Sequence, residues 1–405
     1  GDPSAPARTG IIKPEPIPTR VKVVLVGDYH LYDYLFENDP DFQEIFKIRS
    51  DFQLETDLTP RLLKSDFPGF VAEICRDEGL APVNAAGLAR LAEYGVRQAG
   101  RRGKITAQST ILADVLREAH FWSAQSRKRT ISADEIDRAI REAIDRVNLL
   151  ERKIAEMIAD GTILISLTGS RVGQVNGLAI YDMGDYAFGK PSRITCETSV
   201  GQGGILNIER ESGFSGRSHD KGVQILGGYL RACFAQERPL SLTASICFEQ
   251  SYSGIDGDSA SATEMYAILS SLSNLPIRQD IAVTGSVNQK GDMQPIGGVN
   301  EKIEGFFDCV RAARPTGQEG VIIPRANVDD LMLRRDVVAA VEKGTFHIYA
   351  IDTVSEGIEI LTGIPAGKRR KDGSYPPGCV YSRVEARLEE LANHLRRFEV
   401  SSEEG

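Results

Sequence analysis

The sequence has little of what marks several large classes of protein. Its six cysteines are scattered without a C-x-x-C pair, and its five histidines form no metal-ligand spacing, so no metal site is expected. No apolar run reaches the ~20 residues that span a bilayer, and the first residues show no signal-peptide pattern. The net charge of −9 lacks the basic excess typical of nucleic-acid binding. We therefore expect a cytoplasmic protein with reduced cysteines and with no membrane or nucleic-acid partner.

A phosphate-binding loop is also absent from the sequence. The pattern G-x-x-x-x-G-K-[ST] does not occur: around the nearest candidate, Gly103-Lys104, Gln98 replaces the first glycine and Ile105 follows the lysine. No apolar strand ends in the Asp-Glu pair that would hold Mg²⁺. Because ATP hydrolysis needs both features, we expect these 405 residues to use no cofactor, with ATP and Mg²⁺ entering only where a complete nucleotide-binding half is present.

Among the residues that are present, Ser259 stands out by its position. It follows Gly254-Ile255-Asp256-Gly257-Asp258 and precedes an apolar stripe at helical spacing. The stripe consists of Ala262, Met265, Tyr266, Leu269 and Leu272. The serine is therefore predicted to lie at or near a helix start, where free backbone N–H groups can hold an oxyanion.

Lys302 occupies an unexpected face of a second predicted helix, over residues 299–313. The polar side of this helix carries Glu301, Glu304, Asp308 and Arg311, whereas Lys302 is in phase with Phe306, Cys309 and Val310. A lysine among apolar neighbours is disfavoured as an ammonium, so its pKa falls from about 10.4 toward neutrality. A lysine of that kind can serve a serine as general base.

Each residue alone also fits an ordinary role: Ser259 as a helix N-cap and Lys302 as a lysine whose amine reaches water. Together with Val283-Thr284-Gly285-Ser286 and residues 291–298, however, the region resembles the proteolytic domain of the Lon family of serine–lysine peptidases. The resemblance covers residues 163–366. It implies that Ser259 is the nucleophile and Lys302 the base, that N–H groups of Asp258 and Ser259 beside Gly257 bind the oxyanion, and that the Thr284 hydroxyl orients Lys302.

The N-terminal part has a weaker resemblance. Residues 21–27 are predicted to form a buried strand that ends in Asp28, and with residues 39–47 they resemble the back half of an AAA+ nucleotide-binding domain of the Lon-related branch. The resemblance implies a sensor-like, nucleotide-binding position for Asp28. Residues 66–160 are predicted to be helical, including one long helix from the capping box at residues 132–135 to Met157, and resemble an AAA+ lid.

Further elements are predicted within the proteolytic region. Short strands are expected at residues 163–165, 172–181, 194–198, 240–248, 321–323 and 346–350, and helices at 328–341 and 381–398. Ser218-His219-Asp220-Lys221 matches the S-x-x-K of penicillin-binding enzymes, but S-D-N and K-T-G are missing. Ser218 is therefore predicted to be a helix cap. Strand edges near residues 175–181 or 251–255 are candidates for binding an extended substrate.

These features predict a multidomain α+β chain of 405 residues. The predicted domains are a linker at 1–19, the C-terminal part of an AAA+ α/β domain at 20–65, an α-helical lid at 66–160, an α/β Lon proteolytic domain at 161–366 and a C-terminal extension with a helix at 367–405. The resemblance implies an endopeptidase for unfolded polypeptides, enclosed in a homo-oligomeric ring, a hexamer. The alternative is a ring remodeller or scaffold with an inert protease fold, for which loss of Ser259 or Lys302 would be the signature; both are present.

Overall fold

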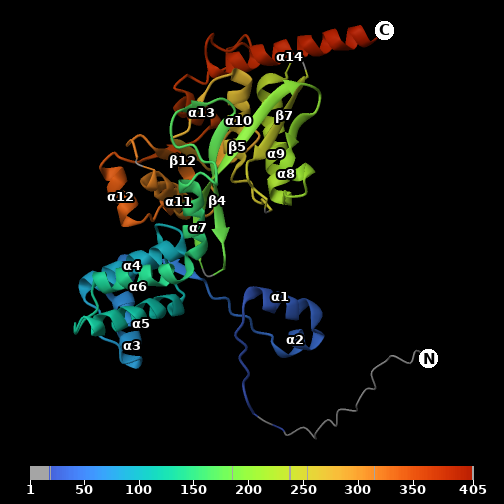
Figure 1. The fold of residues 1–405 in the computed structure, drawn as a ribbon. Coiled ribbons are helices and arrows are strands. Elements are labelled where there is room, and N and C mark those ends of the chain that lie inside the picture. Colours follow the sequence, from blue (N-terminus) through green and yellow to red (C-terminus); the bar gives the residue numbers. More distant parts are fainter. Residues whose placement is uncertain are drawn as a thin grey trace, which may run out of the picture. The chain divides into compact units, whose positions relative to one another are not determined.

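The computed structural model describes residues 18, 20–184, 186–236, 239–252, 254–313 and 315–403 (Figure 1). Within the chain, residues 1–53 and residues 54–405 form two compact units. The first contains α1 (Tyr29–Asn38) and α2 (Pro40–Ile45). Each helix begins after an aspartate whose carboxylate accepts backbone N–H bonds, Asp28 for α1 and Asp39 for α2, as is typical of N-caps.

The strand predicted at residues 21–27 is wrong. The segment has no regular secondary structure, and Val24 and Val26 are 82% and 95% exposed. A buried parallel strand needs hydrogen-bonded neighbours and covered faces. No strand in the described part of the chain pairs with residues 21–27. Asp28, expected at the end of that strand, accepts a 2.7 Å hydrogen bond from the N–H of Leu31. Its nucleotide contact stays a prediction.

The second unit begins with a helical domain around its own apolar core. It consists of η1 (Leu62–Asp66), α3 (Phe67–Asp77), α4 (Ala85–Ala99), α5 (Ser109–Gln125), α6 (Ala133–Val147) and α7 (Leu149–Ala159), with β1 (Glu55–Asp57) antiparallel to β2 (Lys104–Thr106). The capping box of Ser132 and Glu135 is present. The single long helix predicted from it is wrong, because Asn148, at ψ 16°, leaves the helical range and separates α6 from α7.

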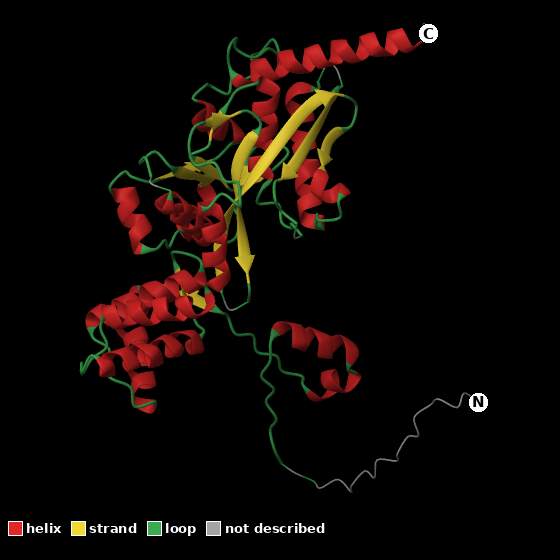
Figure 2. Ribbon diagram, in the orientation of Figure 1, coloured by secondary structure: helices red, strands yellow, loops and turns green. Residues whose placement is uncertain are grey.

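A mixed seven-stranded sheet organises the rest of the unit (Figure 2). Its strands, in spatial order, are β13 (His347–Ile351), β12 (Gly320–Pro324), β9 (Ile281–Val283), β4 (Gln174–Asp182), β5 (Ala187–Val200), β7 (Leu242–Phe248) and β6 (Gly204–Asn207). The strands from β13 to β4 run parallel, whereas β4–β5 and β5–β7 are antiparallel. Two-stranded pairs join β3 (Ser170–Arg171) to β8 (Ile277–Arg278) and β10 (Ser286–Val287) to β11 (Met293–Gln294).

Helices cover both faces of this sheet. One core contains α9 (Arg217–Phe234), α10 (Ser261–Ser273), α13 (Val354–Thr362) and α14 (Val380–Glu403), and the other contains α11 (Val299–Ala312) and α12 (Arg335–Glu342). Ile322 of β12 belongs to the first core, while Val321 and Ile323 belong to the second. Alternate side chains of a strand point to opposite faces, so the central strands are buried on both sides. The predicted mixed α/β architecture with a helical lid is confirmed.

Several local predictions for this region need correction. Residues 163–165 form no strand, and the helix predicted over 328–341 is a 3₁₀ turn, η2 (Arg325–Asp330), followed by α12. Ser218 does not cap α9: the N-cap is Gly216, and Asp256 accepts the N–H of Ser218 at 3.1 Å. The short helix α8 (Ile208–Glu211) was not predicted. No described helix is long and apolar enough to cross a membrane.

Candidate active site

Ser259 lies in a turn two residues before α10 and is held there through its backbone. Its carbonyl accepts the N–H of Gly285 at 2.9 Å, and the N–H of Ala262 donates to the carbonyl of Gly285 at 3.1 Å. The residues that follow β9 thus join the start of α10. Gly257, at φ +86°, supplies the left-handed turn just before the serine. The prediction that Ser259 lies at or near a helix start is confirmed.

Lys302 projects from the first turn of α11 into the protein interior. Its side chain is almost fully buried, with the residue 2% exposed, and its Nζ lies 2.9 Å from Ser259 Oγ. Burial lowers the pKa of Lys302 to about 8, against the smaller opposing effect of the Asp258 and Glu301 carboxylates. The predicted inward face and lowered pKa are therefore both present. An ammonium donates to the serine hydroxyl across this distance, whereas a neutral amine can accept its proton.

A glycine contact sets how closely the lysine's helix approaches the sheet. A Cβ on Gly189 of β5 would lie 2.6 Å from the Cα of Lys302, and a Cβ on Gly305 of α11 would collide with the backbone of Gly189. Real side chains do not tolerate such distances, so backbone lies directly on backbone here. The depth of α11, and with it the position of the Lys302 amine, depends on both glycines.

The supporting residues expected from the resemblance lie around the pair. Thr284 is buried, and its hydroxyl donates to the Ser259 carbonyl at 3.4 Å. This bond differs from the prediction, in which the Thr284 hydroxyl orients Lys302. The Asp258 carboxylate accepts the hydroxyl of Ser286 at 2.7 Å. Across the described residues, no protein acceptor is bonded to the N–H groups of Asp258 and Ser259. Both donors are available to a ligand.

One set of contacts at this site was not predicted. The backbone of Ile255 pairs with Phe214 and Gly216, each at 2.7 Å, and Asp256 accepts N–H bonds from the start of α9. Residues 214–219 thus hold the loop that leads to Ser259. The edge at residues 251–255, proposed for substrate, is occupied at Ile255. These partners lie about forty residues apart in sequence, as the separation of 38 between Ser218 and Asp256 shows, and local patterning carries no signal for such a contact.

A buried histidine–glutamate contact connects the two helices, α9 and α10, that adjoin this loop. His219 and Glu264 are both essentially unexposed, with His219 Nε2 at 2.8 Å from Glu264 Oε1. His219 Nδ1 lies 2.9 Å from the hydroxyl of Ser215. The start of α9 and the first turn of α10 are thereby connected. In the described part of the chain, no group of His, Cys, Asp and Glu has a geometry that could hold a metal ion.

Comparison with known protein families matches three parts of the chain. The model for the Lon protease (S16) C-terminal proteolytic domain matches residues 249–362, which contain both Ser259 and Lys302. The models for the archaeal LonB AAA+ ATPase LID domain and for the LonB-like AAA domain match residues 82–146 and 3–53. The matches define a peptidase-type domain joined to parts of an AAA+ module.

Individual relatives agree with this assignment. A protein described as a Lon protease homolog from Escherichia coli (strain K12) is 34% identical over 350 residues, which cover 86% of this chain and 59% of that protein. An archaeal Lon protease of Thermococcus kodakarensis is 29% identical over 296 residues, covering 72% of this chain and 43% of that protein. The matched parts of the chain are therefore similar to the domains of the Lon protease family. The chain spans about half the length of the curated relatives it matches.

Proposed function

We propose that the chain is a serine endopeptidase in which Ser259 is the nucleophile and Lys302 its general base. The observation that carries the proposal is the 2.9 Å approach of a buried lysine amine to the serine hydroxyl. A lysine that only stabilised the fold would be expected to bring its charge to water or to a carboxylate. Here the hydrogen-bond partner of Lys302 is the hydroxyl of Ser259, in a turn where the N–H groups of Asp258 and Ser259 are available to a ligand.

The chemistry follows from this arrangement. Neutral Lys302 accepts the Ser259 proton while Oγ forms a bond to the peptide carbonyl carbon, and the N–H groups of Asp258 and Ser259 bind the resulting oxyanion. The lysine then returns the proton to the departing amine as the C–N bond breaks. Water, deprotonated by Lys302, then attacks the acyl carbon, the C–O bond to Ser259 Oγ breaks, and Lys302 returns the proton to Oγ. Thr284 keeps the Ser259 carbonyl in place during these steps.

An open strand edge next to the pair suits an extended substrate. One edge of β4 pairs with β5 at every residue of β4, whereas the other edge pairs with β9 only at Asn176 and Gly177. On the edge that faces β9, residues 178–182 of β4 pair with no described strand. This edge leads toward Gly298, at the start of α11, which lies against Ile180. A peptide added as a further strand there would bind through backbone groups, which favours unfolded polypeptide over folded protein.

We further propose that these 405 residues cleave unfolded chains without ATP, because neither Ser259 nor Lys302 needs a nucleotide for its chemistry. Stably folded proteins should resist, since a phosphate-binding loop for ATP-driven unfolding does not occur in the sequence. By resemblance to the family, the subunits form a closed homo-oligomeric ring, a hexamer, that encloses Ser259. Free thiols at all six cysteines support a reducing, cytoplasmic compartment.

The dependence of casein hydrolysis on pH tests the proposed base. Since only neutral Lys302 can accept the proton, the rate should rise through a pKa of about 8 and level off above it, so that at pH 7 about a tenth of the molecules are active. Initial rates measured across this range, with far-UV circular dichroism to confirm an unchanged fold, give the profile. A rate that is flat from neutral to alkaline pH would contradict the assignment.

A further inference from the structure

The outer face of α11 is held by charged groups from the helical lid. Glu301 and Glu304 flank Lys302 in sequence, but on a helix they point away from it, because successive residues are turned by about 100°. Lys302 therefore faces Ser259 while the two carboxylates face outward. The element that meets them is α4 of the lid.

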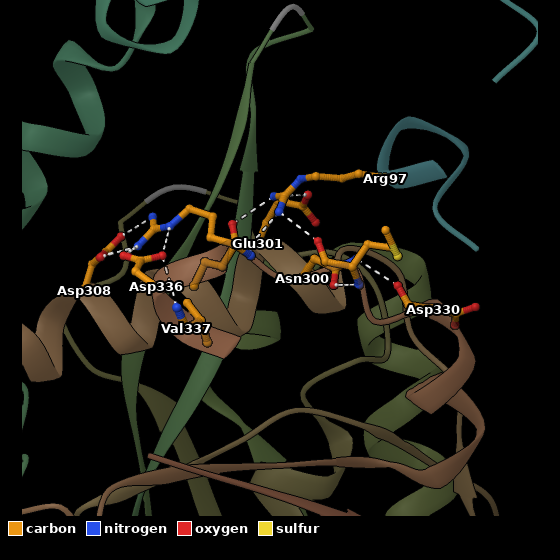
Figure 3. A network of polar contacts seen from close by, with 10 residues as sticks. Arg97, Asn300, Glu301, Asp308, Asp330, Asp336 and Val337 are labelled. Atoms are coloured by element: carbon orange, nitrogen blue, oxygen red, sulfur yellow. Dashed lines mark hydrogen bonds and ion pairs between the residues drawn. The ribbon is translucent and has the colours of Figure 1, made fainter. Parts of the chain in front are cut away.

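Arg97, near the end of α4, contacts both carboxylates. Its guanidinium donates to Glu304 through two nitrogens, at 2.5 Å and 2.8 Å, and to Glu301 at 3.4 Å. Figure 3 shows Arg97 reaching over Glu301 at the start of α11. The Arg97 and Glu304 side chains are 26% and 9% exposed, so this is a two-pronged ion pair largely shielded from water. Such forks fix orientation as well as distance.

The same face of α11 is gripped by the segment between η2 and α12. Arg97 also donates to the carbonyl of Met332 at 3.1 Å, and the N–H of Met332 donates to Asn300 Oδ1 at 2.7 Å. One turn further along, Arg334 binds both carboxylate oxygens of Asp308, at 2.8 Å and 2.7 Å (Figure 3). Arg97 is the member of this network that comes from the lid.

We propose that Arg97 is a positioning residue for the peptidase reaction: by holding Glu301 and Glu304, the lid fixes the first turn of α11 and so places the Lys302 amine against Ser259. The inference rests on the proposed function, in which Lys302 is the base. On this proposal the lid is part of the peptidase, because the contact of Arg97 with Glu301 and Glu304 sets the position of the Lys302 amine and the charge around that amine.

The charges around these groups give the expected direction of change. Two carboxylates are close enough to raise the pKa of Lys302: Asp258, from the Ser259 loop, and Glu301, which points away from the amine on the same helix. Arg97 is faced by Glu301, Glu304 and Arg334. From α7, Glu151 adds a carboxylate within range of Glu304, Asp308 and Arg334. Removing the Arg97 charge leaves Glu301 unbalanced beside Lys302, and extra negative charge favours the ammonium form.

The test compares peptide hydrolysis by wild-type protein and Arg97→Met across pH. We expect the rising part of the pH–rate profile (the limb) to move to higher pH by about half a unit, because the charge of Arg97 is lost. The plateau kcat should fall by about tenfold, because the amine is less well placed. KM should stay within about twofold, since Arg97 does not line the proposed substrate edge. A variant with the wild-type limb and plateau would overturn the proposal.

Three further variants separate this role from simple loss of packing. Arg335→Met is the matched control: Arg335 joins α12 to Glu93 and Asp137 of the lid, at 3.0 Å and 3.1 Å, and these ion pairs do not involve α11. It should keep the wild-type profile. Arg97→Lys, which retains the charge but not the fork, should keep the limb and recover part of the plateau. Glu301→Gln should shift the limb to lower pH, opposite to Arg97→Met.

These outcomes also decide the case in which Arg97→Met does not fold. The proposal would be overturned if Glu301→Gln did not shift the pH–rate profile. It would also be overturned if Arg335→Met and Arg97→Lys lowered the plateau kcat equally and gave the same pH–rate profile. Ser259→Ala, assayed in parallel, reports on the proposed function alone. Full activity in that variant would remove Lys302 as a base, whereas an inactive Ser259→Ala beside a wild-type-like Arg97→Met would reject the positioning role only.

Discussion

Ser259→Ala is expected to abolish casein hydrolysis, with turnover lower by about 10⁴-fold or more. The reason is that the variant removes the atom that attacks the substrate while leaving every backbone contact of the turn in place. The Ser259 carbonyl still accepts the N–H of Gly285, and the side chain loses one hydrogen bond, to Lys302, worth ~1 kcal/mol. Hydrolysis rates and a thermal unfolding curve, measured on the same preparation, check both parts.

Ser218→Ala is the matched control for that experiment. Ser218 stands three residues before Lys221 in the S-x-x-K match, but its own side chain is exposed in the first turn of α9. Its replacement should leave activity unchanged. Turnover near wild type in Ser259→Ala, or a comparable loss in Ser218→Ala, would show that the nucleophile has been assigned to the wrong serine.

Lys302→Arg should be as inactive as Lys302→Met, although arginine keeps the positive charge. A guanidinium does not deprotonate at any pH at which the protein is folded, so it cannot accept the Ser259 proton. It must also place a larger, permanently charged group in a site where the native residue is 2% exposed. Casein hydrolysis from neutral to alkaline pH is the measurement. An active arginine variant would make Lys302 structural.

The stability of Lys302→Met provides an independent reading of the same lysine. The pKa of Lys302 is lowered to about 8 in the folded chain, against about 10.4 when unfolded. Between these values the unfolded chain binds the extra proton, so stability rises with pH, and below about 8 the folded state carries the full penalty. Removing the amine should therefore stabilise the fold at pH 7 by a few kcal/mol, with the gain vanishing above about pH 10.

The essential pair of residues could be predicted from the sequence because each has a local signal. Lys302 shares the helical phase of Phe306 and Val310, and a polar residue in an apolar stripe is visible without a structure. Ser259 precedes an apolar stripe at helical spacing. The alternation along β7, buried at every second residue, was equally legible. In these places local patterning and the final fold agree.

The rest depended on partners distant in sequence. The run at residues 21–27 has the composition of a buried strand, but a strand exists only where a neighbour pairs with it. Thr284 was expected to contact Lys302, but its hydroxyl donates to the Ser259 carbonyl. The backbone conformation after β9 determines this contact, and the sequence pattern does not show it. Arg97 and Glu304 are separated by 207 positions. Nothing in the sequence near α4 shows which carboxylate its arginine would find.

Covalent labelling with a fluorophosphonate probe, followed by peptide mapping, tests the paired roles of Ser259 and Lys302 most directly. The probe reacts with a serine in proportion to the nucleophilicity of its hydroxyl, without requiring substrate binding, oligomer assembly or ATP. We expect one modified residue, Ser259, with a labelling rate that rises through pH about 8 as Lys302 loses its proton, and no labelling in Lys302→Met. Modification of a different serine, or labelling of Ser259 at an equal rate in Lys302→Met, would contradict the proposed dyad.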